Sequence, residues 1–246
     1  MDSDILITDL DAVRRQCRAT LSRIQSEYAR RAPAGSDQVT PAQLGTALEM
    51  FFGLAERADS PAGSAPLAGE ETTRIGDYGM QVLADLIAWA GQLELTEDRL
   101  ALLSAAPALG DWISRHGGEL QAPEPIVDAL ALAANRTSDP ASLSELVRFT
   151  TRMLNAFSRA LKSDLENTNP GRPWRVLHLN RAIAATRTHD LALMAQIFDE
   201  LVQALPQDAP RFFAEGMSEM DRLNYPAPVR AVMERYYRQF ALRKMH

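Results

Sequence analysis

The stretch SDPASLSELVRFTTRMLNAFSRALKSDLE, residues Ser138–Glu166, predicts one long amphipathic helix and decides the fold class. Ser138 and Asp139 are residue types that cap a helix, and Pro140 is tolerated in a first turn. At about 100° per residue, the large apolar side chains fall on one side of the helix. These are Leu146, Phe149, Met153, Leu154, Phe157 and Leu161. We therefore expect this side to pack in a core.

The opposite side of the predicted helix is basic. Within about 80° of one another around its axis lie Arg148, Arg152, Arg159 and Lys162. A face of this kind is typical of a solvated surface, and also of a docking surface for an acidic partner. Packing against the acidic part of the same chain is a third interpretation. The sequence leaves all three open.

The helical period recurs along the rest of the chain. A helix over 9–31 is marked by apolar residues at spacings of three and four, namely Leu10, Val13, Cys17, Leu21, Ile24 and Tyr28. Thr40 and Pro41 begin the next helix. Further helices are expected at about 73–91, 97–116, 125–136, 140–166, 174–187, 190–204, 208–222 and 227–243. No alternating strand pattern stands out. The predicted fold is all-α, with about ten helices in antiparallel hairpins forming an irregular bundle or short superhelix.

Proline and glycine suggest how the chain is divided. They are frequent from Asp59 to Glu71, which predicts an exposed loop. We therefore expect an N-terminal helical hairpin over 1–58, a flexible loop or linker over 59–72, and a main helical domain over 73–246. Within the helix at 97–116, Thr96 is expected as the cap and Pro107 as a kink or split.

Composition excludes several classes of protein. The only cysteine among the 246 residues is Cys17, so neither an intramolecular disulfide nor a cysteine-based metal cage can form. No apolar run approaches the roughly 18 residues of a membrane span, and the start has no signal-peptide pattern. We expect no transmembrane segment and a cytoplasmic location.

Charge is distributed unevenly along the chain. Asp37 to Glu124 holds 14 acidic and 4 basic residues, a balance of −10. Arg148 to Arg187 holds 8 basic and 2 acidic residues, a balance of +6. Charges separated in this way often form separate surface patches. Pairing of the two stretches between copies would give a homo-oligomer.

Motifs that carry chemistry are missing. Neither a phosphate-binding glycine loop nor a Gly-x-Ser-x-Gly turn occurs, and zinc and di-iron spacings are absent, so no cofactor is predicted. His189-Asp190 is similar to the His-Asp pair of all-helical metal phosphohydrolases, but the further metal ligands are not apparent and no metal is predicted. Asp190 is better interpreted as a helix N-cap. Cys17 lies on an apolar helix face and is interpreted as a buried, inert thiol.

The segment from Trp174 to Pro206 resembles one tetratricopeptide-like helical hairpin. Its second helix carries Ala195, Phe198 and Leu201 and ends at Leu205-Pro206. The later segment Pro226–Arg230 is similar to the start of a HEAT helix. The expected hairpins near 73, 125, 174 and 208 are spaced 52, 49 and 34 residues apart, so no fixed repeat is present. The resemblance implies stacked helical hairpins and protein–protein binding, and it identifies no binding residue.

The favoured hypothesis is a non-enzymatic interaction or adaptor protein that binds an acidic protein partner. Its predicted binding surface consists of Arg148, Arg152, Arg159, Lys162, Arg172, Trp174, Arg175 and Arg181. Trp174 has a second interpretation, as a hydrophobic anchor at a helix start. Nucleic acid is disfavoured as a partner because the pI is about 5.3.

Two other classes stay open. One is a small-ligand or nucleotide-responsive regulatory protein, and the other is an enzyme with an unrecognised site. A deep polar pocket lined by arginines would favour the regulator. A broad convex basic surface would favour the interaction protein.

Overall fold

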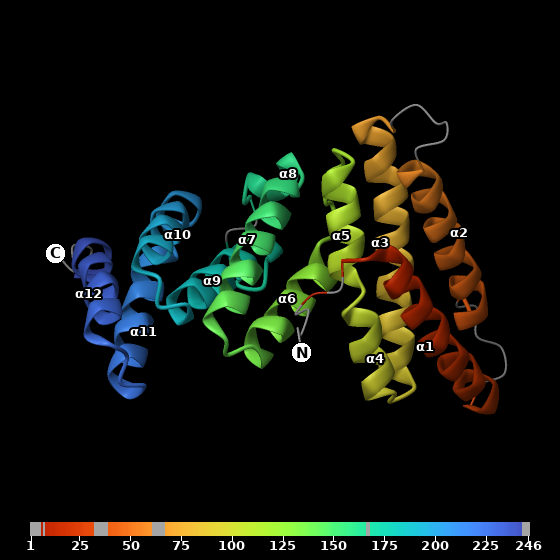
Figure 1. The fold of residues 1–246 in the computed structure, drawn as a ribbon, viewed down its shortest axis with the longest axis horizontal. Coiled ribbons are helices and arrows are strands. Elements are labelled where there is room, and N and C mark those ends of the chain that lie inside the picture. The colour runs from red at the N-terminus through yellow and green to blue at the C-terminus, as the bar shows by residue number, and fades with distance from the viewer. Residues whose placement is uncertain (1–5, 7, 32–38, 61–66, 166–167, 243–246) are drawn as a thin grey trace. The chain divides into compact units, whose positions relative to one another are not determined.

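The computed structural model describes residues 6, 8–31, 39–60, 67–165 and 168–242. These residues form helices α1 to α12, a final π-helical segment and connecting turns (Figure 1). The only β-type pairing in them is an isolated parallel bridge between Leu120 and Phe157, so the predicted all-α fold is confirmed. In this part of the chain, no helix combines the length and the apolar character needed to cross a membrane.

The chain divides into two compact units. Unit 1 comprises Met1–Ala133 and Asn155–Leu165, and unit 2 comprises Ala134–Leu154 and Glu166–His246. The first six helices are α1 (Leu10–Arg31), α2 (Pro41–Asp59), α3 (Gly69–Gln92), α4 (Thr96–Leu103), α5 (Ala106–Arg115) and α6 (Glu124–Arg136). The remaining elements are α7 (Pro140–Ala156), α8 (Arg159–Lys162), α9 (Pro173–Arg187), α10 (Leu191–Ala204), α11 (Ala209–Arg222), α12 (Ala227–Tyr236) and η1 (Tyr237–Ala241).

Unit 1 is built around α3, which packs against α2, α4 and α5. α1, α2 and α3 lie side by side (Figure 1). Phe51 of α2 contacts Trp112 of α5 with ring centroids 5.6 Å apart. A Cβ atom built on Gly79 of α3 would overlap the Phe51 ring of α2, so glycine allows α2 and α3 to approach this closely. The helices of the expected hairpin, α1 and α2, belong to unit 1, and the division predicted at 59–72 stays a prediction.

Several helix ends match the expectations. The Thr40 hydroxyl accepts a hydrogen bond from the Gln43 amide in a capping box. Pro107 lies in the first turn of α5, where the predicted helix over 97–116 is split into α4 and α5. Other ends differ. Leu95 occupies the N-cap of α4 in place of Thr96. α3 begins at Gly69, within the expected loop; residues 61–66 of that loop lie outside the described residues.

Unit 2 contains two helical hairpins, in which α9 packs against α10 and α11 against α12. Its core contains an aromatic cluster. The ring of Phe198 on α10 lies 5.2 Å from the rings of both Phe213 on α11 and Tyr236 on α12. The Tyr236 hydroxyl donates to the Ala195 carbonyl at 2.9 Å, which satisfies a polar group inside this core. These contacts join the two hairpins within the unit.

The predicted single helix over 140–166 is wrong, because α7 ends at Ala156. The backbone of Leu120 pairs with the chain at this point: its amide donates to the Ala156 carbonyl at 2.7 Å, and its carbonyl accepts from the Ser158 amide at 2.9 Å. This bridge places Phe157 in the core. Ser158 then caps the short helix α8.

Candidate functional site

The break between α7 and α8 divides the predicted basic face. Arg148 and Arg152 are exposed on α7 in unit 2. Arg159 and Lys162 are exposed on α8 in unit 1. The four side chains therefore do not share one continuous helical face, and the geometric argument for a single basic stripe no longer holds.

Three of these four residues have local contacts. The Arg148 guanidinium lies 3.9 Å from the Glu145 carboxylate, a long ion pair between exposed groups. Arg152 lies over the Phe149 ring at 4.9 Å from its centroid, a cation–π contact. Lys162 donates to the Asn155 carbonyl at 2.6 Å. All three leave the charged groups accessible to solvent.

The basic turn before α9 is folded onto its own unit. Arg172 and Arg175 both pair with the carboxylate of Asp208, at 2.9 and 2.6 Å. Arg172 is only 5% exposed, and it also donates to the Asn169 carbonyl at 3.0 Å. Burial raises the pKa of Asp208, but the hydrogen bonds from the two guanidinium groups outweigh burial and hold this pKa below its usual value. These two arginines therefore serve the fold of unit 2.

Arg181 is also internal, at 3% exposed. Its guanidinium lies 2.8 Å from the Glu200 carboxylate and donates to the Thr151 hydroxyl at 3.1 Å. Desolvation lowers its pKa, and the charge and hydrogen bond of Glu200 oppose that effect only in part. The arrangement connects α7, α9 and α10 inside unit 2.

A buried histidine belongs to the same cluster. His178 Nδ1 lies 3.3 Å from Arg181 Nη2, and the Trp174 ring meets the imidazole edge-to-face at 4.3 Å between centroids. Desolvation, with the nearby charge of Arg181, lowers the pKa of His178 to about 3. The imidazole is therefore neutral at physiological pH. Trp174 is half-buried against the core of unit 2, as expected for a hydrophobic anchor.

The His189-Asp190 pair has a structural role in the described chain. The Asp190 carboxylate accepts hydrogen bonds from the amides of Ala192 and Leu193, both at 3.0 Å, so the predicted N-cap is confirmed. His189 occupies the turn before α10 with φ of 59° and contacts the Tyr225 ring. Among the described residues, no group of three or more His, Cys, Asp and Glu residues could hold a metal ion.

Unit 2 has a groove between α9 and α11 with a mainly apolar lining, which we call the apolar groove. Its volume is about 320 Å³. Its apolar lining consists of Ile183, Phe212, Met220, Leu223, Tyr225 and Met233. The remaining lining residues are Thr186, Arg187, Glu215, Gly216 and Glu219. Such a lining suits an apolar ligand surface oriented by a few polar groups.

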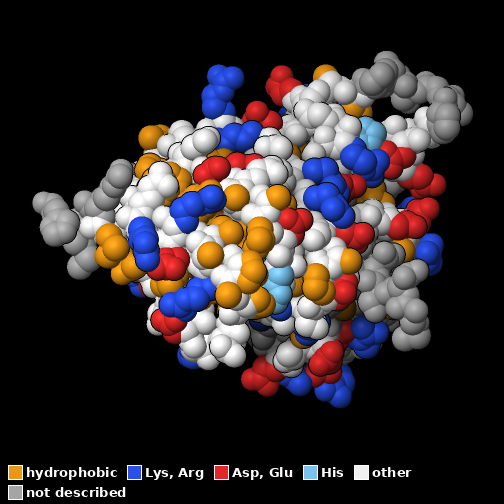
Figure 2. All heavy atoms as spheres, turned by 60° about the vertical axis from the view of Figure 1, so that its left-hand side comes forward, with side chains coloured by type: hydrophobic (Ala, Val, Ile, Leu, Met, Phe, Trp, Pro, Cys, Tyr) orange, Lys and Arg blue, Asp and Glu red, His pale blue; other side chains and the backbone are white. Residues whose placement is uncertain are grey.

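Two of the groove residues are unusually exposed for their type. Ile183 on α9 is 49% exposed, and Leu223 at the end of α11 is 52% exposed. Figure 2 shows hydrophobic side chains gathered between charged side chains on the face that it draws. Apolar side chains that line a concave site from two different helices form a contiguous contact surface for a partner, whereas single scattered apolar residues do not.

Charged side chains border the groove on both helices. On α11, Glu215 and Glu219 lie one turn apart, and each also forms an exposed ion pair outside the groove lining, with Arg211 and Arg222 respectively. On α9, Arg187 donates to the Ala134 carbonyl at 2.6 Å and to the Thr137 carbonyl. These two bonds fix the direction of its guanidinium. The groove thus has an acidic wall on α11 and a single cation on α9.

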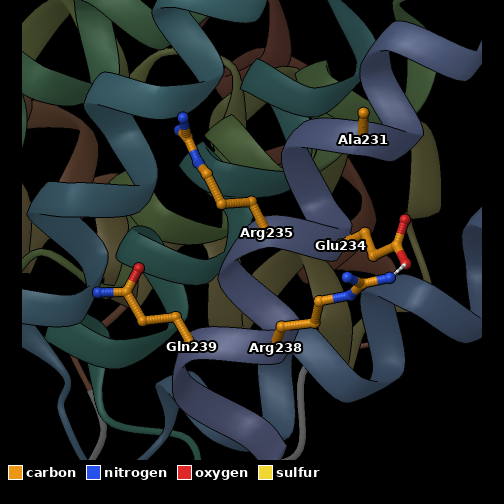
Figure 3. A pocket seen from close by; sticks show the side chains of 5 residues that line it. All are labelled: Ala231, Glu234, Arg235, Arg238 and Gln239. Carbon is orange, nitrogen blue, oxygen red and sulfur yellow. Dashed lines mark hydrogen bonds and ion pairs between the residues drawn. The ribbon is translucent and has the colours of Figure 1, made fainter.

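A second hollow in unit 2 is polar and open. It has a volume of about 540 Å³ and is lined by Ala231, Glu234, Arg235, Arg238 and Gln239, all from α12 and η1. Figure 3 shows Arg238 paired with Glu234, while Arg235 and Gln239 extend away from that pair. Because one side of one helical segment supplies every lining residue, the hollow encloses little, and the apolar groove is the better candidate.

Sequence reasoning did not find the apolar groove. Its lining comes from α9, from α11 and the turn after it, and from Met233 of α12, and no sequence motif marks these residues. The available signal was a pair of large apolar residues, Ile183 and Leu223, outside the main core stripes of their helices. Comparison with known proteins adds no further site, since no protein-family model, no curated protein and no solved structure matches the chain.

Proposed function

We propose that this protein is a non-enzymatic binding protein that engages a protein partner through the apolar groove of unit 2. The observation that carries the proposal is the exposure of Ile183 and Leu223 beside a concave apolar lining. Covering such surface is favourable by about 25 cal/mol per Å² of apolar area removed from water. The hairpin resemblance of residues 174–206, which form α9 and α10, supports the same class of function.

A basic contact surface for an acidic partner is the second candidate. It is favoured by the exposure of Arg148 and Arg152, which lie one turn apart on α7. Arg159 and Lys162 offer a separate basic contact on α8. The other predicted residues are committed to internal contacts, or to the core in the case of Trp174. A nucleotide-responsive regulator is less well supported, because the apolar groove offers one arginine and two carboxylates in place of a deep polar pocket.

Site-specific photo-cross-linking in the native host tests the proposal. A benzophenone amino acid placed at Ile183 or Leu223 should form a discrete adduct with a partner protein. Met50 on α2 is the matched control, because it is a large apolar residue of similar exposure, 58%, in unit 1. Adducts at both groove positions and none at Met50 support a partner at the groove. The absence of adducts at both groove positions, with the protein folded and expressed, contradicts it.

A further inference from the structure

We propose that the partner segment in the apolar groove is an amphipathic α-helix with lysine or arginine beside its apolar face. This inference rests on the proposed function and adds the shape and charge of the partner. Three features of the groove carry it: its extent along α11, the chemistry of its walls and the position of its charges.

The lining of the groove extends along α11. On α11 and its C-cap residue the lining includes Phe212, Gly216, Met220 and Leu223, at successive spacings of four, four and three residues. This series follows about three turns, or about 16 Å, along one side of the helix. The facing wall is supplied by α9, where Ile183 and Arg187 lie one turn apart. A lining of this form fits a rod-shaped segment whose anchoring side chains repeat every three or four residues.

The walls favour a helix over an extended segment. Both α9 and α11 satisfy their backbone amides and carbonyls internally, so neither offers an unpaired edge to a partner. An extended peptide laid on apolar side chains would lose water from backbone groups that find no new partner. A helix brings its backbone hydrogen bonds with it.

The floor of the groove can adapt to inserted side chains. Gly216 leaves room for the thioether of Met233, since a Cβ atom at position 216 would lie 2.8 Å from both its Sδ and its Cε. Methionine is flexible and polarizable, which suits variable apolar contacts. A volume of about 320 Å³ is at the small end of ligand sites, so side chains enter while the partner backbone stays above them.

The charges at the groove determine which sign of charge the partner carries beside its apolar face. Glu215 and Glu219 border the groove on the same side of α11. Their present partners, Arg211 and Arg222, are exposed, and exposed ion pairs contribute little and exchange easily. A cation beside the apolar face of the partner would contact both carboxylates, whereas an acid there would be repelled.

Peptide binding tests this inference. We would synthesise three fluorescent peptides of about 18 residues that share one apolar stripe, long enough for helix formation on binding. The first has lysine beside the stripe, the second has glutamate there, and the third is the lysine peptide with a central proline. By fluorescence anisotropy against the full chain, the lysine peptide should bind at least about tenfold more tightly than the other two.

Variants of the chain assign the effect to the groove. Glu215→Lys with Glu219→Lys should reverse the preference between the lysine and glutamate peptides, and Glu215→Gln with Glu219→Gln should abolish it. Glu145→Lys, an exposed carboxylate on α7, is the control and should leave the preference unchanged. Leu223→Glu should weaken binding of the lysine peptide by at least about tenfold. Melting curves confirm that each variant is folded.

The outcomes separate this inference from the proposed function. Equal binding of all three peptides, or binding of none, overturns the amphipathic helix. Cross-links from Ile183 and Leu223 to a partner would in either case leave the proposed function standing. Self-association in sedimentation that Leu223→Glu abolishes would also overturn the inference, because the occupant of the groove would then be a second copy of the chain.

Discussion

Arg172 and Asp208 lie 36 residues apart in sequence and form an ion pair of 2.9 Å in the structure. Arg172 sits just before α9, and Asp208 just before α11. Asp208 occupies the N-cap position of α11, but its carboxylate makes no hydrogen bond to that helix. The carboxylate forms ion pairs with Arg172 and Arg175 instead. The pairing thus fastens the turn before α9 to the start of α11.

Removal of this carboxylate should destabilise unit 2. Asp208→Asn would remove the carboxylate that pairs with the buried guanidinium of Arg172, and breaking a fully buried pair costs about 3–5 kcal/mol. Because Asp208 is partly exposed, we expect the free energy of unfolding to fall by about 2 kcal/mol. Glu215→Gln, which removes an exposed pair with Arg211, is the control and should change stability by less than about 0.5 kcal/mol. Equal effects of the two variants in urea denaturation would contradict the assignment.

The same ion pair predicts a pH dependence. The pKa of Asp208 is lowered in the folded chain, so its stabilising contribution is complete above the usual aspartate pKa of about 3.9. It is lost as pH falls from there through the lower folded pKa. The difference in unfolding free energy between wild type and Asp208→Asn should therefore be constant near neutrality and shrink below about pH 4. A difference that is unchanged down to pH 2.5 would show that the carboxylate is not stabilised as a charged group.

His178 should lower stability in the same direction, as pH falls, but over a higher pH range. Its pKa of about 3 in the folded chain lies below the unfolded value of about 6.5, so the unfolded state takes up a proton first. Stability should fall as pH drops from about 6.5, with a limiting slope of about 1.4 kcal/mol per pH unit from this group. His178→Gln should remove that part of the slope. Titration of the His178 imidazole near pH 6.5 by NMR would refute the prediction.

The helix positions could be predicted because helical periodicity is a local signal. The end of α7 could not, because it depends on Leu120, which pairs with the chain 36 residues further on. Ser158 was a usable clue, since serine is a common N-cap residue. The apolar residues on both sides of it nevertheless continued the helical pattern.

The candidate site was harder to predict for the same physical reason. Net charge along the chain identified the basic stretch, but whether an arginine is exposed depends on distant residues. Arg172 finds Asp208, and Arg181 finds Glu200 on a neighbouring helix. The apolar groove likewise exists only once α9 and α11 are placed beside each other.

The packing of α2 on α3 can be tested with two glycines. Gly79→Ala places a methyl group against the Phe51 ring, and overpacking of this kind costs about 1–3 kcal/mol. Gly53→Ala on α2 is the control, since a Cβ atom there has no neighbour within 4 Å and alanine favours a helix by about 0.5–1 kcal/mol. Thermal unfolding should show opposite signs. If Gly79→Ala were neutral, α2 would pack less closely on α3 than the structure shows.

The last prediction concerns the basic residues of α7. Arg148→Glu with Arg152→Glu should leave the fold intact, because both side chains are exposed; the cation–π contact of Arg152 with Phe149 accounts for only about 0.5–1 kcal/mol. If α7 contacts an acidic partner, the double variant should slow association with the cross-linked partner, more at low salt than at high salt.

Arg159→Glu with Lys162→Glu on α8 provides the comparison for this test. A single stripe would make the two double variants equivalent, since all four residues would meet the same partner surface. We expect different effects, because the two pairs lie on separate helices, α7 and α8. Surface plasmon resonance with the captured partner separates the cases. Equal losses in association rate would show that both pairs of residues contact the same partner surface. No loss in either variant would exclude an acidic partner at these residues and leave the apolar groove as the contact.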